Sequence, residues 1–189
     1  MKRIVVLASG TGSLAEAIFD SDFSDQNAEV VALICDQPEA LVLERAGLRH
    51  LESYTIPMLS DRNLWNSELE SLIAALRPTL VVSAGFMRIL PEAITDRFKI
   101  INSHPALLPL FPGAHAVRDA LAAGATETGT TIHWVDAGID TGEVISQEKI
   151  EILPGDTEES LHERIKIVER GLIVATIRQV LPTLEPINV

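Results

Sequence analysis

The 189-residue sequence has one cysteine, an acidic excess and no long apolar run. The single thiol, Cys35, excludes an internal disulfide and is typical of a reducing compartment. The basic start is followed by only five apolar residues, 4–8, which are too few for a signal-peptide core or a membrane span. We therefore expect a cytoplasmic protein without a membrane partner.

Basic residues are also scarce, since 15 Lys and Arg face 27 Asp and Glu, giving a formal net charge of −12. An acidic surface repels phosphate backbones, so nucleic acid is not expected as a partner. A small anion can still be held by local backbone N–H groups. Repeats, low-complexity tracts and linkers are absent, and 47% of residues are hydrophobic, so we expect one domain over 1–189.

Buried apolar runs alternate with helical patterns through the first half of the chain. This order predicts an α/β fold, Rossmann-like and three-layered, with a mostly parallel twisted sheet and helices on both faces. The expected strands are 4–8, 29–35, 53–56, 80–82 and 99–102, and the expected helices are 14–19, from Pro38 to about 48, and 62–76.

The pattern changes after Gly113. A short helix is expected over 115–123, then two alternating strands, 129–135 and 143–150, as antiparallel neighbours. A last helix is expected after a cap at Asp156, with apolar positions at 161, 165, 168, 172 and 175. Ligands of open α/β sheets bind at the carboxyl ends of strands, where four loops are expected: 10–14, 85–90, 102–113 and 136–142.

The glycine-rich segment 9–15, Ser-Gly-Thr-Gly-Ser-Leu-Ala, follows the first strand and opens a helix, an arrangement that favours a phosphate ligand. It also fits G-x-G-x-x-A, with Asp36 placed like a ribose-binding acid, so a dinucleotide remains an alternative. A Gly-Lys-Ser/Thr sequence is lacking, so the segment is not a Walker loop. A plain tight turn capped by Ser13 is the structural alternative.

Asn102, His104 and Asp140 form a second group, because an amide, an imidazole and a carboxylate together can move a proton and stabilise an oxyanion. A packed histidine and a simple Asp turn are the alternatives for His104 and Asp140, and His133 is equally well explained by packing. His104, His115 and His133 lack metal-ligand spacing, so no metal is expected. Cys35 is expected in the core rather than as a nucleophile.

The segment 85–90, Gly-Phe-Met-Arg-Ile-Leu, carries apolar side chains past a strand end, and it either continues the core or lines a slot for a flat aromatic ligand. Glu169 lies on the apolar stripe of the last helix. A carboxylate there needs a partner, unless it faces water at the rim.

Together these motifs resemble the phosphoribosylglycinamide formyltransferase family. The matching pieces, in family order, are Ser-Gly-Thr-Gly-Ser at 9–13, Ala-Gly-Phe-Met-Arg-Ile-Leu at 84–90, Asn-Ser-His-Pro-Ala-Leu-Leu-Pro at 102–109, Phe-Pro-Gly at 111–113 and Ile-Asp-Thr-Gly-Glu-Val-Ile at 139–145. The resemblance implies the Rossmann-like α/β fold of this family. It also implies formyl transfer from 10-formyltetrahydrofolate to the amine of 5-phosphoribosylglycinamide, a step of purine biosynthesis. It implies small-molecule substrates and no metal, and it leaves a homodimer open.

The resemblance also implies roles for particular residues. The implied catalytic residues are Asn102, His104 and Asp140. The residues implied for the ribonucleotide phosphate and sugar are Gly10, Thr11, Gly12, Ser13, Leu14, Lys166, Ile167, Val168 and Glu169. The residues implied for the folate are Arg62, Met87, Arg88, Ile89, Leu90, Asn102, Asp136, Ala137, Gly138, Ile139 and Asp140.

The expected mechanism is direct attack of the amine on the formyl carbon. Asn102 and a protonated His104 would stabilise the tetrahedral oxyanion. Asp140 would keep His104 charged and oriented, and it would accept or relay the proton that the amine loses. Two departures stand out: the family commonly has Asn at position 14, here Leu14, and often a basic residue at 110, here Leu110.

Related families set the remaining alternatives. Methionyl-tRNA formyltransferases and formyltetrahydrofolate deformylases share parts of the pattern, but they carry extra domains for which this chain is expected to have no room. An NAD-dependent oxidoreductase or regulator and a non-catalytic binding module are the other readings.

Overall fold

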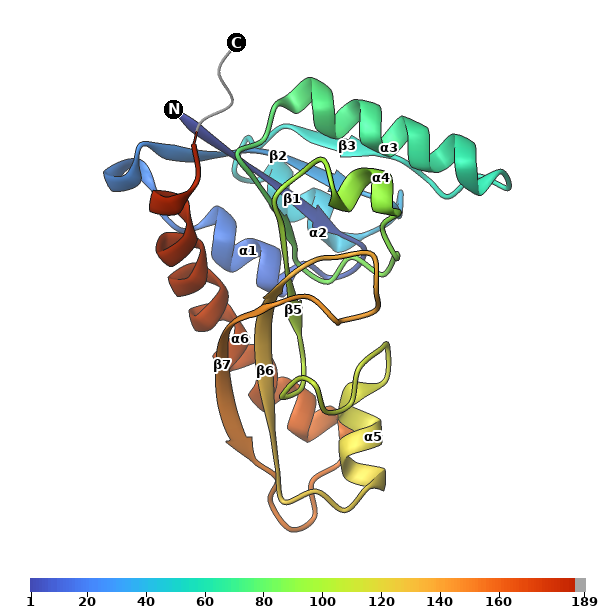
Figure 1. Ribbon diagram of the computed structural model, residues 1–189. Coiled ribbons are helices and arrows are strands. Elements are labelled where there is room, and N and C mark those ends of the chain that lie inside the picture. The colour runs from blue at the N-terminus through green and yellow to red at the C-terminus, as the bar shows by residue number, and fades with distance from the viewer. Residues whose placement is uncertain (186–189) are drawn as a thin grey trace.

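The computed structural model describes residues 1–185 and contains a seven-stranded sheet in the order β3-β2-β1-β4-β5-β6-β7 (Figure 1). The first five strands in this order are parallel, and β6 and β7 are antiparallel to their neighbours. The mostly parallel α/β sheet with an antiparallel C-terminal part is thus confirmed. The strands are β1 (Lys2–Ala8), β2 (Ala28–Cys35), β3 (Ser53–Thr55), β4 (Leu80–Ser83), β5 (Ile100–His104), β6 (Glu127–Trp134) and β7 (Val144–Glu151).

Helices cover both faces of the sheet. Alternation along β1 explains the layers: Ile4 and Val6 pack on one face with α1, α2 and α6, and Val5 and Leu7 pack on the other with α3 and α4. The helices are α1 (Ser13–Phe19), α2 (Leu41–Gly47), α3 (Arg62–Leu76), α4 (Glu92–Thr95), α5 (Ala116–Ala122) and α6 (Glu158–Val180), with short 3₁₀ turns at Ser24–Gln26 and Leu181–Thr183.

The last helix differs from its prediction at both its start and its buried face. Thr157 rather than Asp156 is the N-cap, in a capping box with Ser160, while Asp156 accepts hydrogen bonds from Leu153 and Ser160 just before the helix. The buried positions follow a four-residue spacing, 161, 165, 169, 173 and 177, which drifts around the 3.6-residue helix away from the predicted stripe and leaves Ala175 exposed. This places Glu169 inside the molecule.

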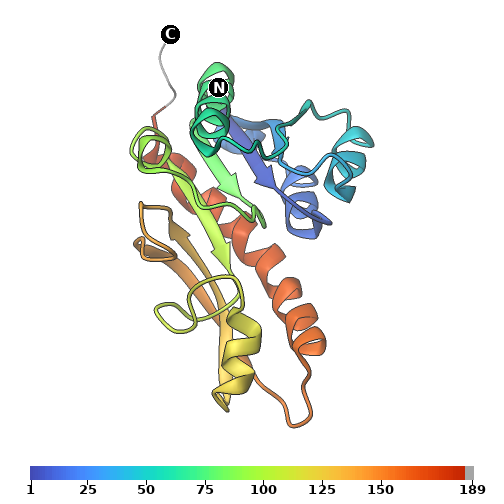
Figure 2. The ribbon, with the colours of Figure 1, turned by 90° about the vertical axis from the view of Figure 1, so that its right-hand side faces the viewer.

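The edge where the parallel strands end holds all four predicted loops. Ser83, the last residue of β4, pairs with Asn102, and β5 continues past this point to His104. Because β6 runs antiparallel, its carboxyl end at Trp134 pairs with Ile101, close to where β4 ends. The loop 136–142 therefore reaches the same edge, and Figures 1 and 2 show it beside β5. Residues 186–189, part of the predicted single domain, lie outside the described residues.

Candidate active site

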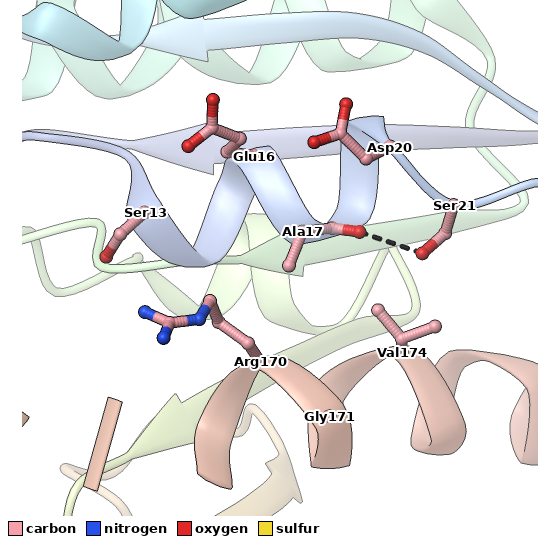
Figure 3. Close-up of a pocket in the computed structure, with 8 residues that line it drawn as sticks. All are labelled: Ser13, Glu16, Ala17, Asp20, Ser21, Arg170, Gly171 and Val174. Carbon is pink, nitrogen blue, oxygen red and sulfur yellow. Dashed lines mark hydrogen bonds between the residues drawn. The ribbon is translucent and has the colours of Figure 1, made fainter. Parts of the chain in front are cut away.

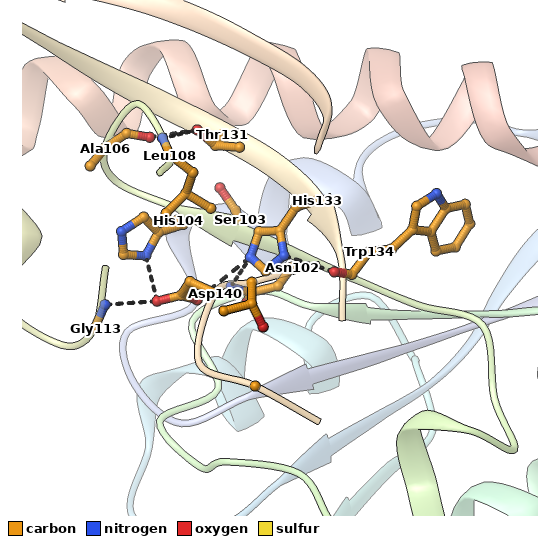
Figure 4. Close-up of polar contacts among 12 residues, drawn as sticks. Asn102, Ser103, His104, Ala106, Leu108, Gly113, Thr131, His133, Trp134 and Asp140 are labelled. Carbon is orange, nitrogen blue, oxygen red and sulfur yellow. Dashed lines mark hydrogen bonds and ion pairs between the residues drawn. The ribbon is translucent and has the colours of Figure 1, made fainter. Parts of the chain in front are cut away.

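His104 and Asp140, which are 36 positions apart in sequence, meet at this edge. His104 Nδ1 lies 3.3 Å from Asp140 Oδ2, and both side chains are largely shielded from water (Figure 4). The other ring nitrogen of His104, Nε2, lies 2.8 Å from the carbonyl oxygen of Phe111. Asp140 has a left-handed backbone, with φ of 54°, and Oδ2 accepts a hydrogen bond of 2.8 Å from Gly113 N–H. The sequence-predicted pair is thus a physical contact.

His133, for which the sequence left a packing role and a functional role equally open, joins this cluster. Its Nδ1 lies 2.8 Å from the Trp134 carbonyl, which can only accept, so Nδ1 carries a proton. The Nε2 atom lies 3.2 Å from Asn102 Nδ2 and 3.5 Å from Asp140 Oδ1, so it accepts from Asn102 when it carries no proton and faces Asp140 as a donor when it carries one. His133 therefore orients the Asn102 amide and leaves its second N–H free to donate elsewhere. The strand position of His133, opposite Asn102 in β6, is the signal that could have identified it.

The ring of His104 faces two oxygen acceptors but is buried. Burial lowers the pKa of His104, and this effect outweighs the Phe111 carbonyl and the Asp140 carboxylate, which act to raise it. The pKa of Asp140 is lowered: burial alone would raise it, but hydrogen bonds from His133 and Gly113 and the nearby imidazoles prevail. Burial therefore opposes the expected effect of Asp140 on the charge of His104, and the role of Asp140 in keeping His104 charged during the reaction stays a prediction.

This arrangement favours proton uptake when negative charge develops nearby. A neutral imidazole can donate to only one of its two acceptors, whereas an imidazolium donates to both Phe111 and Asp140. An oxyanion forming next to the ring would raise the pKa of His104 and make the protonated form the favoured one. The cluster can thus accept a proton and stabilise an anion in one step.

Two further side chains fix the loop that follows His104. Thr131 Oγ1 donates to the Ala106 carbonyl at 2.6 Å and accepts from Leu108 N–H at 3.1 Å, and both contacts are buried. Gln147 Nε2 donates to the Leu108 carbonyl and to Thr131 Oγ1, at 2.8 and 2.9 Å. The proline-rich loop is therefore held by the antiparallel strands β6 and β7, a contribution that no local motif revealed.

The loop 10–14, called the glycine loop below, exposes its backbone rather than its side chains. Gly12 is the N-cap of α1, with φ of 77° and no side-chain cap, so the alternative of a turn capped by Ser13 is wrong. A Cβ on Gly12 would lie 2.4 Å from Val42 Cγ2, so this position needs glycine. Gly10 and Thr11 are exposed, and Leu14 packs against the core, which leaves only its backbone available to a ligand.

A cavity of about 530 Å³ opens between α1 and α6, beginning at Ser13 (Figure 3). Arg170 is the only cation among its lining residues, and its side chain points across the cavity toward Ser13. Two lining carboxylates, Glu16 and Asp20, are paired with Arg45 and Arg49. The predicted residues 166–169 end one position before Arg170 on the same helix.

The four predicted residues 166–169 fill one helical turn and point in different directions. Ile167 is 63% exposed, Val168 packs against a cluster with Leu161, and Lys166 Nζ is 2.6 Å from Glu163 Oε1. Glu169 is buried, which raises its pKa, and it accepts a hydrogen bond of 2.6 Å from Ser103. Ser103 lies between Asn102 and His104 in β5, so Glu169 is tied to the strand that carries them.

Most of the predicted folate residues lie in the loops 85–90 and 136–142, whereas Arg62 begins α3 and Asn102 lies in β5. In the first, Met87 and Ile89 are 70% and 60% exposed, Leu90 is buried, and Arg62 donates to the Ile89 carbonyl at 2.6 Å. In the second, Asp136 accepts from Gly138 N–H and Thr141 Oγ1, which forms an Asx turn and leaves residues 137–139 exposed. Exposed apolar side chains on both loops suit a flat aromatic ligand.

The residues needed for a dinucleotide site or a cysteine nucleophile are not available for those roles. The Asp36 carboxylate is buried and lies 2.6 Å from Arg88 Nε, so it is not available to a dinucleotide ribose. Cys35 is buried, which raises its pKa and disfavours the thiolate. Residues 1–185 contain no group of three His, Cys, Asp or Glu side chains placed to hold a metal. In the same range, no helix is both long and apolar enough to span a membrane.

Comparison with known families agrees with this fold. The family model for formyl transferase matches residues 2–177, so the chain belongs to the formyl transferase family and is a formyltransferase enzyme. The resemblance drawn from the motifs is thus confirmed.

Individual relatives indicate which formyltransferases this chain is similar to in sequence and structure. The phosphoribosylglycinamide formyltransferase of Mycobacterium tuberculosis is 48% identical over 179 residues, which cover 93% of this chain and 83% of the relative. That of Bacillus subtilis is 40% identical and covers 96% of this chain and 95% of the relative. Glycinamide ribonucleotide transformylase 1 from Symbiobacterium toebii has a TM-score of 0.92 at 34% identity, covering 97% of this chain and 89% of that structure.

Proposed function

We propose that this enzyme transfers the formyl group of 10-formyltetrahydrofolate to the amine of 5-phosphoribosylglycinamide, a step of purine biosynthesis. The observation that carries the proposal is the contact of His104 with Asp140, beside Asn102 and between two loops with exposed apolar side chains. The names of the relatives in Mycobacterium tuberculosis and Bacillus subtilis support the acceptor. The reaction belongs in the cytoplasm, and a homodimer stays a prediction.

The proposed chemistry begins when the amine nitrogen attacks the formyl carbon and the carbonyl π pair moves to oxygen. The free N–H of Asn102 donates to that oxygen, and removing one such donor typically costs about 100-fold or more in rate. The proton that the amine loses passes to His104, whose cation is stabilised by Asp140 and the Phe111 carbonyl. The oxyanion then re-forms the carbonyl as the bond from carbon to N10 breaks, and His104 passes its proton to the leaving N10 nitrogen.

The acceptor nucleotide is proposed to bind between β1 and α6. Backbone N–H groups of Gly10, Thr11, Gly12, Ser13 and Leu14 would hold the phosphate, with Arg170 supplying the charge. This division explains how Leu14 can replace Asn, because its side chain packs in the core. Residues Lys166, Ile167, Val168 and Glu169 remain the proposed sugar side.

The folate is proposed to lie across the two apolar loops. Its pterin end would contact Met87, Arg88, Ile89 and Leu90 on one side, and Asp136, Ala137, Gly138 and Ile139 on the other. Arg62 would be placed near the anionic tail. In the structure Arg62 also lies 4.6 Å from the centre of the Trp65 ring, so its guanidinium is already oriented.

The test is to mix the protein with glycinamide ribonucleotide and a 10-formyl folate and to follow formyl loss spectroscopically. Transfer that requires both compounds is expected. Formyl loss from the folate in the absence of the nucleotide would indicate a deformylase instead. No formyl loss, with or without the nucleotide, would indicate a non-catalytic binding module.

A further inference from the structure

Asp36 is a buried charge that the proposed reaction does not use. The residue is 2% exposed at the carboxyl end of β2, and its Oδ2 lies 2.6 Å from Arg88 Nε and 3.2 Å from Gln37 Nε2. Its Oδ1 is buried without a hydrogen-bond partner among residues 1–185. A carboxylate removed from water requires a nearby cation, and Arg88 is the cation that contacts it.

Arg88 belongs to the loop 85–90, where it separates the exposed side chains of Met87 and Ile89. Other parts of the chain hold the backbone on either side: Ser9 Oγ accepts from Met87 N–H at 2.9 Å, and Arg62 donates to the Ile89 carbonyl. The contact with Asp36 holds Arg88, the residue between Met87 and Ile89. Of these three contacts, it is the one whose partner is a buried carboxylate. Moving Arg88 would leave that charge unpaired.

We propose that Asp36 is a positioning residue for the folate-binding loop. Through Arg88 it holds Met87 and Ile89 in the geometry that receives the pterin, without touching the ligand itself. The inference rests on the proposed function, which places the folate on this loop. It also explains why an acid at the position typical of a ribose-binding residue points into the protein.

The first test is Asp36→Asn, which keeps the size of the side chain and removes its charge. The Michaelis constant for 10-formyltetrahydrofolate should rise about tenfold, while kcat and the constant for glycinamide ribonucleotide stay within about twofold. Glu70→Gln is the matched control, because it also removes a carboxylate partner of an arginine, Arg97 at 2.7 Å, but on the surface. It should change none of the three constants.

A second variant keeps the test decisive if Asp36→Asn folds poorly. Arg88→Met preserves the apolar stem and removes the cation, and it should raise the same folate constant. The double variant should be no worse than the more severe single variant, because one contact is lost in both. A merely structural role would instead lower kcat, weaken nucleotide binding and reduce the Tm together, and that result overturns the inference.

The outcomes separate this inference from the proposed function. If the unmodified protein transfers no formyl group, the proposed function fails, and this inference fails with it. If transfer is normal and the folate constant is unchanged in a folded Asp36→Asn, only the positioning role of Asp36 is contradicted. This holds whatever Arg88→Met does, because Arg88 is itself proposed to contact the pterin.

Discussion

The His104 cluster and the glycine loop lie at the same edge of the sheet, yet they use different parts of the chain. The cluster consists of buried side chains from β5, β6 and the loop 136–142, each with named partners. The glycine loop offers exposed backbone at Gly10 and Thr11, and the side chain of Leu14 is turned to the core. The first should therefore tolerate almost no side-chain change, whereas the second depends on backbone shape.

The largest effect should come from His104→Asn. Loss of the proton acceptor should lower kcat by about 1,000-fold, while the Michaelis constant for the nucleotide stays within about threefold. Asp140→Asn should behave similarly, because His104 loses the carboxylate at 3.3 Å. Steady-state kinetics with each co-substrate varied measures both constants.

His50→Asn is the matched control for the same chemical change. His50 is exposed and has φ of 55°, a left-handed conformation that Asn adopts readily, so its activity should be unchanged. If His104→Asn instead weakened nucleotide binding and left kcat normal, the His104 cluster would bind the nucleotide rather than catalyse the reaction.

The next effect should come from Gly12→Ala. The added Cβ would meet Val42 Cγ2 at 2.4 Å on a backbone with φ of 77°, so the loop must shift. The Michaelis constant for the nucleotide should rise about tenfold or more, and that for the folate should not change.

Gly124→Ala controls for backbone strain alone. Gly124 also has a positive φ, of 65°, but a Cβ there meets nothing within 4 Å. It should cost some stability without changing either Michaelis constant. Equal weakening of folate binding in Gly12→Ala would mean that the glycine loop does not belong to the nucleotide.

The sequence predicted the parallel half of the fold well because most strands there, apart from β3, are local apolar runs. The predicted helix 62–76 matches α3, and the strand 4–8 falls within β1. The start of α2 was wrong: the helix begins at Leu41, because residues 38–40 form a turn first. β5 was predicted to end at Asn102, yet it continues to His104, since pairing with Thr131 in β6 extends it.

Site residues that lie in sequence motifs could be predicted, whereas those that reach the site through contacts between strands could not. Asn102, His104 and Asp140 could be named from sequence, and the structure brings them together. His133, Thr131 and Gln147 could not, because their roles depend on the register of β6 and β7. The charge state of His104 also depends on burial, which no motif encodes.

The smallest effect concerns Glu169, which connects the two regions by accepting from Ser103 between Asn102 and His104. Burial raises the pKa of Glu169, so its stabilising contribution is present below its ordinary value of about 4.3 and is lost as pH rises through the raised value. Glu169→Gln is always neutral. It should therefore raise the free energy of unfolding at pH 7 by roughly 1 kcal/mol relative to the parent, and by less at pH 4.

Urea unfolding at both pH values measures this difference, with Glu163→Gln as the control on the same helix. Glu163 is exposed and pairs with Lys166, which holds its pKa below the ordinary value, so its replacement should bring no gain. A gain for Glu169→Gln that is equal at pH 4 and pH 7 would contradict a buried carboxylate. If the gain grows with pH and nucleotide binding weakens at the same time, the acid is kept at a cost in stability because the sugar side of the site needs it.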